Sequence, residues 1–181
     1  TLQDLSGLPE GTGMTTEAKP QGLFQVIVLA GQRPEGDPLA RSQGHEWKAL
    51  VPVAGMPMVE RVLLALLAAP SIGQIAVAAP TPRLLDDILS LHEAVESGRI
   101  RILPTEAGPA ASTAAAWKAM GMPCPALVTT ADHALLTPEL LEHFCQRASR
   151  TQSDIQAALV PATAIRAAFP EARRTYLRFK E

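Results

Sequence analysis

The sequence has 181 residues, 47% of them hydrophobic and 19% charged, and its 16 basic and 18 acidic residues give a net charge of −2. This composition predicts one globular domain with a sizeable core, and it gives no electrostatic reason to expect a nucleic acid or a membrane surface as partner. No apolar run approaches the roughly 20 residues that a membrane span needs, and we expect no secretory signal. The two cysteines, Cys124 and Cys145, lack CxxC spacing, which favours reduced thiols in a cytoplasmic protein.

Residues 1–22 are rich in Gly, Pro and Thr, and we expect them to form a flexible tail ahead of one domain at 23–181. Within that domain, apolar runs alternate with segments of helix-like, amphipathic pattern. The predicted elements in chain order are a strand at 24–30, a helix at 58–69, a strand at 74–79, a helix at 82–97, a strand at 99–103, a helix at 110–120, a strand at 125–131, a helix at 137–149 and a strand at 154–161. Thr81 and Thr137 are the expected N-caps of the second and fourth helices.

Strands separated by helices of this length predict βαβ units, and hence a three-layer α/β/α sandwich with a mostly parallel, Rossmann-like sheet. In such a sheet a ligand lies beyond the carboxyl ends of the strands. The residues at those ends are therefore the first candidates for a binding site: Ala30 and Gly31, Ala79 and Pro80, 105–109, and Ala131 and Asp132.

A long polar loop follows the first strand and reaches Lys48 (QRPEGDPLARSQGHEWK, 32–48). Gly31 ahead of it lets the backbone approach a ligand closely, because glycine has no Cβ. Arg33, Arg41 and Lys48 together with loop amides suit a polyphosphate, whose oxygens need several donors and positive charge at once. The alternative is an ordinary solvated surface loop. The spacing meets neither the dinucleotide-binding G-x-G-x-x-G nor the P-loop signature.

Asp132 directly follows an apolar strand-like run and is the only acid between Glu106 and Glu139. A carboxylate fixed at the end of a strand is a suitable Mg²⁺ ligand because it is hard and anionic; the alternative is an aspartate that caps the next turn. His133 beside it either binds phosphate or hydrogen-bonds the loop. Ser112, in the first turn of a predicted helix, either contacts a base or ribose or serves as an ordinary capping residue.

Three of these segments resemble a known family. VIVLAG, followed by the charged loop, KAL and VAGMPMVERVL, is similar to the N-terminal signature of the MobA-like nucleotidyltransferases, which have a glycosyltransferase-A-like fold. LVTTADHALLTPELLEHF resembles the family's segment that delivers a metal-binding aspartate, and GPAASTAAAW resembles the segment that contacts the base. The resemblance runs from about Phe24 to Phe144. The wider group includes molybdenum-cofactor guanylyl- and cytidylyltransferases, methylerythritol-phosphate cytidylyltransferases and sugar-phosphate pyrophosphorylases.

The resemblance implies a Mg²⁺-dependent transfer of a nucleotidyl group from CTP or GTP to a phosphorylated small-molecule acceptor, with release of pyrophosphate. The molybdenum-cofactor type is the expected one. Lys48, Arg41 and Asp132 would be catalytic, with Asp132 as the metal ligand. The nucleotide would contact the following residues: Leu29, Ala30, Gly31, Arg33, Lys48, Ala79, Pro80 and Ser112.

The sequence also departs from the family pattern. Gln32 stands where a second glycine is usual, and the loop to Lys48 is longer. The chain ends about where the second metal ligand of the family is expected, so we expect the domain to lack its C-terminal part; the alternative is a divergent member of the family. Two other functions stay open: a non-catalytic nucleotide-binding or regulatory homologue, and a glycosyltransferase that uses a nucleotide sugar, although Thr130-Ala131-Asp132 lacks the first Asp of a DxD motif.

Overall fold

The computed structural model describes residues 23–32, 35–172 and 176–177. The predicted tail at 1–22 and Arg33 lie outside the described residues. The strands are β1 Phe24–Leu29, β2 Pro52–Val53, β3 Met56–Pro57, β4 Ile72–Ala79, β5 Ile100–Pro104 and β6 Ala126–Thr130. The helices are α1 Pro38–Ser42, α2 Met58–Ala68, α3 His92–Glu96, α4 Pro109–Ala119, α5 Pro138–Ser149 and α6 Ala162–Ala168, with single 3-10 turns η1 Lys48–Leu50 and η2 Leu89–Leu91.

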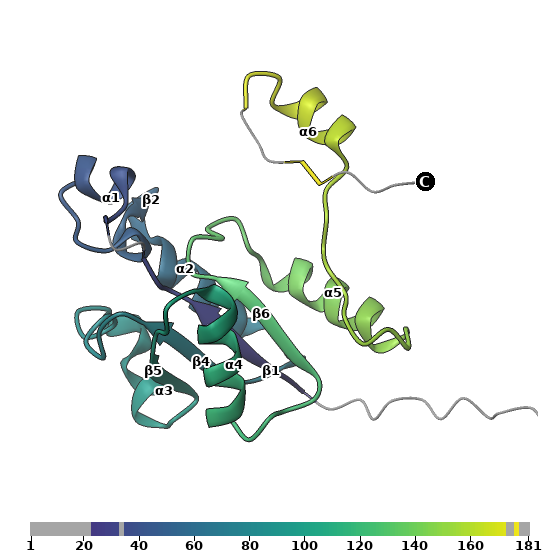
Figure 1. Ribbon diagram of the computed structural model, residues 1–181, viewed down its shortest axis with the longest axis horizontal. Helices are drawn as coiled ribbons and strands as arrows, with labels where there is room; N and C mark the ends of the chain where they lie inside the picture. Colours follow the sequence, from purple (N-terminus) through teal and green to yellow (C-terminus); the bar gives the residue numbers. More distant parts are fainter. Residues whose placement is uncertain (1–22, 33–34, 173–175, 178–181) are drawn as a thin grey trace, which may run out of the picture.

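Strand β1 lies inside a parallel four-stranded sheet with the order β5-β4-β1-β6 (Figure 1). Val28 of β1 pairs with Val77 of β4 on one side and with Thr129 of β6 on the other. Helix α4 lies across one face of the sheet, while α2 and α5 pack together on the other (Figure 1). These layers confirm the predicted α/β/α sandwich with a parallel sheet. β2 and β3 form a separate antiparallel pair ahead of α2.

Packing in the hydrophobic core holds strand β1 in place from both of its faces. Val26 and Val28 on the α2 side are fully buried, and Ile27, which points to the opposite face because strand side chains alternate, is buried as well. Helix α2 buries Val62 and Leu63 against this surface. Burying a large apolar side chain contributes about 1.5–3 kcal/mol, so burial on both faces holds the end of β1 in a defined place.

The helix predicted at 82–97 is wrong over its first half, where residues 82–87 form turns ahead of η2 and α3. The apolar spacing that suggested a helix is met by four side chains that are buried by the turns, the residue after them and η2: Leu84, Leu85, Ile88 and Leu91. The Asp-Asp pair in this segment interrupts helical structure, because aspartate favours turns over helix interiors. Thr81 caps a turn, its Oγ1 accepting from the Arg83 amide at 3.3 Å.

The strand predicted at 154–161 is also wrong. These residues form no strand, and the chain after α5 runs away from the sheet to α6 (Figure 1). Ile155 and Val160 are 88% and 64% exposed. An apolar run becomes a strand only where a neighbouring strand completes its hydrogen bonds and packing covers its side chains, and this segment pairs with no strand in the described part of the chain.

The other predicted strands and helices are confirmed within two residues at each end. Thr137 is the N-cap of α5, as predicted, and its Oγ1 accepts from the Leu140 amide at 3.2 Å. Cys124 is exposed and Cys145 buried, and neither forms a disulfide. Within the residues that the structure describes, no helix combines the length and apolarity needed to cross a membrane.

Candidate functional site

A cleft of about 530 Å³ opens at the carboxyl edge of the parallel sheet. It is bounded by the ends of β1 and β6, by the loop between β5 and α4, and by η1. Its lining consists of Leu29, Ala30, Gly31, Gln32, Lys48, Ala49, Thr105, Glu106, Ala107, Gly108, Pro109, Ser112, Thr130, Ala131 and Asp132. The cleft therefore lies where a parallel sheet ordinarily places its ligand.

Gly31 lies in the lining of the cleft, at the end of β1 and opposite Thr105 of the β5–α4 loop. A Cβ added at Gly31 would lie 3.4 Å from the Thr105 Cγ2 atom, in ordinary van der Waals contact. Glycine thus leaves the backbone at the end of β1 uncovered by a side chain, and close approach of a ligand there stays a prediction.

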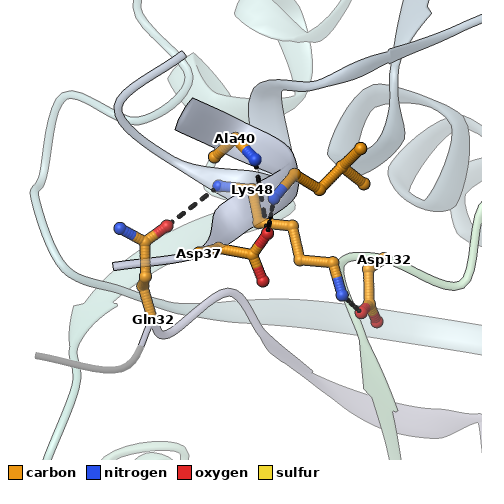
Figure 2. Close-up of polar contacts among 6 residues, drawn as sticks. Gln32, Asp37, Ala40, Lys48 and Asp132 are labelled. Carbon is orange, nitrogen blue, oxygen red and sulfur yellow. Dashed lines mark hydrogen bonds and ion pairs between the residues drawn. The ribbon is translucent and has the colours of Figure 1, made fainter. Parts of the chain in front are cut away.

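Among the described residues that line the cleft, Lys48 and Asp132 form an ion pair (Figure 2). Lys48 opens η1 and Asp132 follows β6, and the Lys48 Nζ atom lies 2.6 Å from the Asp132 Oδ2 atom. Their side chains are 36% and 38% exposed, so both charges remain accessible to solvent and to a ligand. An ion pair this exposed contributes at most about 1 kcal/mol to stability. Its greater importance is that it presents two charged groups in the cleft.

Opposing effects act on the pKa of the Asp132 carboxyl. Burial raises this pKa, whereas hydrogen bonds from the Lys48 ammonium and the Thr130 hydroxyl, together with the Lys48 charge, lower it, and the net pKa lies below its ordinary value. Asp132 is therefore a carboxylate at neutral pH. Asp132 and Lys48 thus place an anionic oxygen ligand and an ammonium donor side by side in the cleft, whose lining also includes Glu106.

Ser112 connects α4 to the loop that borders the cleft. It is 4% exposed, and its Oγ atom accepts a hydrogen bond from the Glu106 amide at 2.8 Å. It therefore fastens the loop rather than the first turn of its own helix, where Gly108 is the N-cap. Because Gly108 and Pro109 line the cleft, the positive end of the α4 dipole borders it.

The polar loop after β1 contains α1, a short helix that the sequence did not predict. Asp37 is its N-cap, and its Oδ1 accepts from the amides of Leu39 and Ala40 at 2.9 and 3.3 Å (Figure 2). The segment from Asp37 to Ser42 therefore forms a capped helical turn of its own. Arg41, in the last turn of α1, does not line the cleft, and its guanidinium lies against Gly36.

The structure brings together most of the predicted site residues and separates the rest. Those that line the cleft are Leu29, Ala30, Gly31, Lys48, Ser112 and Asp132, together with the strand-end segment at 105–109. Arg41, Ala79 and Pro80 lie outside the lining, and Arg33 is not among the described residues. Ala79 is buried in the core at the end of β4.

Gln32 also lines the cleft, and its hydrogen bonds to the loop backbone were not predicted from the sequence. Its side-chain amide donates to the Glu46 carbonyl and accepts from the Lys48 amide, and Figure 2 shows the second of these hydrogen bonds. A polar residue directly after a strand-end glycine was the available signal. The sequence alone does not show which backbone atoms such a side chain reaches, because these partners lie 14 and 16 residues away.

A second hollow, of about 660 Å³, lies between β6, α5 and the segment 153–158. His133 borders this hollow and does not line the first cleft. In the part of the chain that the structure describes, no three His, Cys, Asp or Glu side chains gather to hold a metal ion. The first cleft is the better candidate, because three strand ends, an ammonium and a carboxylate converge there.

The fold and the cleft define an α/β protein with a candidate ligand site at the carboxyl edge of a parallel sheet. Its family follows from comparison with known sequences: the model of the MobA-like NTP transferase domain matches residues 26–176. The chain therefore belongs to this family of nucleotidyltransferases, which confirms the resemblance. Functionally curated proteins provide no match to the sequence.

Several solved structures are similar to this chain. 4-Diphosphocytidyl-2C-methyl-D-erythritol synthase from Anaerococcus prevotii DSM 20548 matches at 15% identity and a TM-score of 0.49, over 79% of this chain and 61% of that one. CMP:2-keto-3-deoxy-manno-octonic acid synthetase, complexed with CTP, matches at 16% and 0.45, over 70% and 46%. Rv0371c from Mycobacterium tuberculosis H37Rv matches at 18% and 0.47, over 73% and 63%. The chain thus spans less than two thirds of each of these chains.

Proposed function

We propose that this protein transfers a nucleotidyl group from a nucleoside triphosphate to a phosphorylated small-molecule acceptor, with release of pyrophosphate. The observation that carries the proposal is the Lys48–Asp132 pair in the cleft of an NTP transferase domain. A nucleoside triphosphate bound with a metal ion presents negative phosphates and a positive ion together. The Lys48 ammonium and the Asp132 carboxylate offer a partner to each.

The triphosphate would lie between Lys48, the end of β1 and the first turn of α4. Lys48 supplies a compact positive charge, which suits phosphate oxygens. Gly31 lets the backbone approach the ligand, and the α4 dipole favours an anion at its N-terminal end. Positive charge from a side chain and from a helix end would thus meet at one ligand, which supports phosphate binding better than either group alone.

Mg²⁺ would be held by Asp132 together with the phosphates. Proteins bind this ion through one or two carboxylates, with substrate phosphates and waters completing the octahedron. The residues of the cleft fit this pattern, since Asp132 provides an ionised carboxylate whose Oδ2 already accepts a cationic group. When bound, the ion would neutralise phosphate charge, which is its usual contribution to phosphoryl transfer.

In the proposed reaction, a phosphate oxygen of the acceptor forms a bond to the α-phosphorus of the triphosphate. The bond from that phosphorus to the oxygen bridging the α- and β-phosphates breaks, and its electron pair leaves with pyrophosphate. Such chemistry needs positioning and charge stabilisation more than a covalent participant. Lys48 would hold the phosphates and Asp132 the ion, so these two residues would orient the reacting groups.

The remaining assignments are proposals of finer detail. CTP or GTP would be the donor, and the acceptor would be of the molybdenum-cofactor type. Four predicted residues of the lining would contact the nucleotide: Leu29, Ala30, Gly31 and Ser112. The other three, Arg41, Ala79 and Pro80, do not line the cleft, and their contact with the nucleotide stays a prediction. Arg33 remains a predicted phosphate ligand, and the cytoplasmic location remains a prediction. The unit would be a single nucleotidyltransferase-like domain over 23–181.

Thermal unfolding in the presence of candidate ligands tests this function. We expect one of the four NTPs to raise the Tm in a Mg²⁺-dependent manner, and Asp132→Ala to abolish that dependence. A rise only with a nucleoside-diphosphate sugar would replace the proposal with a glycosyltransferase. The absence of any Mg²⁺-dependent rise would contradict both enzymatic functions and leave the non-catalytic alternative. Pyrophosphate release with phosphorylated acceptors then separates a transferase from a nucleotide-binding homologue.

A further inference from the structure

We propose that Gln32 is a positioning residue that holds Lys48 at Asp132. The Gln32 Nε2 atom donates to the Glu46 carbonyl at 3.0 Å, and its Oε1 atom accepts from the Lys48 amide, also at 3.0 Å. One side chain at the end of β1 thus binds the backbone on both sides of Trp47. Figure 2 shows the hydrogen bond to the Lys48 amide. We refer to these two hydrogen bonds as the Gln32 clasp.

The clasp requires an amide side chain of this length. The donor must face a carbonyl and the acceptor must face an N–H, so the two partners also fix which way the amide is turned. Glutamate retains an acceptor for the Lys48 amide but offers no donor to Glu46. Methionine has a similar length and makes neither bond. Both replacements therefore test the clasp without removing the bulk of the side chain.

The hydrophobic core also holds the backbone around Lys48, in addition to the Gln32 clasp. Trp47 packs against the main core cluster, and Ala49 is buried within it at 5% exposure. The Lys48 amide is the first N–H of η1, a donor that a helical turn cannot satisfy internally. Gln32 supplies its acceptor. The Lys48 main chain is therefore fixed between the core and the clasp.

Fixing the Lys48 main chain determines where its ammonium is found. A lysine side chain has four rotatable bonds, and a main chain that shifts carries the ammonium with it. With the main chain held, the ammonium lies 2.6 Å from the Asp132 Oδ2 atom. Gln32 thus acts through Lys48, and it orders a charged group before any ligand arrives. Such preorganisation is worth roughly a factor of ten or more in positioning-dependent steps.

Chemical labelling of Lys48 tests the clasp without any nucleotide. Each protein is treated with a limiting amount of acetic anhydride, and the acetylation of Lys48 is measured by mass spectrometry relative to that of Lys118, an exposed lysine on α4. In the wild type, Lys48 should react severalfold more slowly than Lys118, because its ammonium is hydrogen-bonded to Asp132. Gln32→Met and Asp132→Asn should both raise the Lys48 to Lys118 ratio severalfold, and Gln32→Glu should give an intermediate ratio.

Gln74→Met is the matched control. The Gln74 Nε2 atom donates to the Gly98 carbonyl at 3.3 Å, and Gln74 does not line the cleft. We expect the wild-type labelling ratio in this variant. A wild-type ratio in Gln32→Met, an equal rise in Gln74→Met, or no rise in Asp132→Asn would overturn the proposal. Circular dichroism checks that each variant is folded. If Gln32→Met does not fold, the Lys48 to Lys118 labelling ratio of Gln32→Glu decides the result.

The consequence for nucleotide binding rests on the proposed function. The dissociation constant of the NTP that stabilises the wild type should rise about tenfold in Gln32→Met, and by less in Gln32→Glu, while the Tm changes little. A purely structural role would instead lower the Tm and leave the affinity of the folded protein unchanged. If the wild type binds no NTP, the proposed function fails, whereas the labelling ratio still decides whether the clasp exists.

Discussion

The Lys48 Nζ atom lies 2.6 Å from the Asp132 Oδ2 atom, although the two residues are 84 positions apart in the sequence. Asp132 follows β6 at the carboxyl edge of the sheet, and η1, which begins with Lys48, borders the same cleft. Both side chains are about one third exposed. The pair thus presents both signs of charge at an accessible surface, which is what a metal-bound triphosphate requires of its site.

Replacing Lys48 by Met should weaken nucleotide binding far more than it weakens the fold. The loss of a charge-assisted contact to phosphate corresponds to an increase of about tenfold to a hundredfold in the NTP dissociation constant. The free energy of unfolding should change by less than about 1 kcal/mol, because the ion pair is solvent-exposed. Titration calorimetry and urea unfolding measure the two quantities.

Lys118→Met is the control for this variant, since Lys118 is exposed on α4 and does not line the cleft. It should change neither quantity. An NTP affinity that is equal in Lys48→Met and Lys118→Met would exclude Lys48 as a phosphate ligand.

Ser112→Ala should loosen the loop that borders the cleft. The Ser112 Oγ atom accepts from the Glu106 amide, and its loss leaves that donor without its protein partner. We expect a loss of about 1 kcal/mol in the free energy of unfolding, together with a severalfold weaker NTP affinity. Ser97→Ala removes the hydrogen bond from Ser97 to the Ala94 carbonyl on α3 and should leave NTP affinity unchanged. If both variants bind NTP as the wild type does, Ser112 has no part in the site.

Sequence pattern predicted the sheet because its two central strands, β1 and β4, are buried on both faces and therefore consist of nearly continuous apolar runs. Val26 to Val28 show this directly, since all three are buried. The same reasoning failed at 154–161, where an equally apolar run has no neighbouring strand in the described structure. It also failed at 82–87. Apolar spacing indicates that Leu84 and Leu85 are buried, but turns can bury these side chains as well as a helix can.

The site was predictable to the extent that it depends on topology. A parallel sheet places Gly31 and Asp132 at one edge, so both were found from strand ends alone. The Gln32 clasp was not predictable from the sequence. It depends on the loop returning so that the backbone at Glu46 and Lys48 lies within hydrogen-bond distance of the Gln32 side chain. Arg41 was assigned by its charge, whereas its position is set by the Asp37 cap of α1, which directs it elsewhere.

Cys145 should make the stability of the protein sensitive to alkaline pH. Burial, with a smaller contribution from the charge of Glu142, raises the pKa of this thiol to about 11. A raised pKa in the folded state means that the contribution to stability is complete below the ordinary thiol pKa and is lost as the pH rises towards 11. Urea unfolding at pH 8 and at higher pH should therefore show a steeper loss in the wild type than in Cys145→Ala.

Thiol labelling gives an independent check of the same burial. At neutral pH Cys124, which is exposed, should react rapidly with Ellman's reagent, and Cys145 should react only on unfolding. Two rapidly reacting thiols in the folded protein, or parallel pH profiles for the wild type and Cys145→Ala, would contradict this assignment.

The most direct test of the proposed site is the effect of Mg²⁺ on NTP affinity in the wild type, in Asp132→Asn and in Asp87→Asn, measured by titration calorimetry. Asp87 is an exposed carboxylate that does not line the cleft. The account predicts that Mg²⁺ strengthens NTP binding in the wild type and in Asp87→Asn, and that this strengthening disappears in Asp132→Asn. An equal effect of Mg²⁺ in all three proteins would contradict the claim that the cleft at Asp132 binds the metal with the nucleotide.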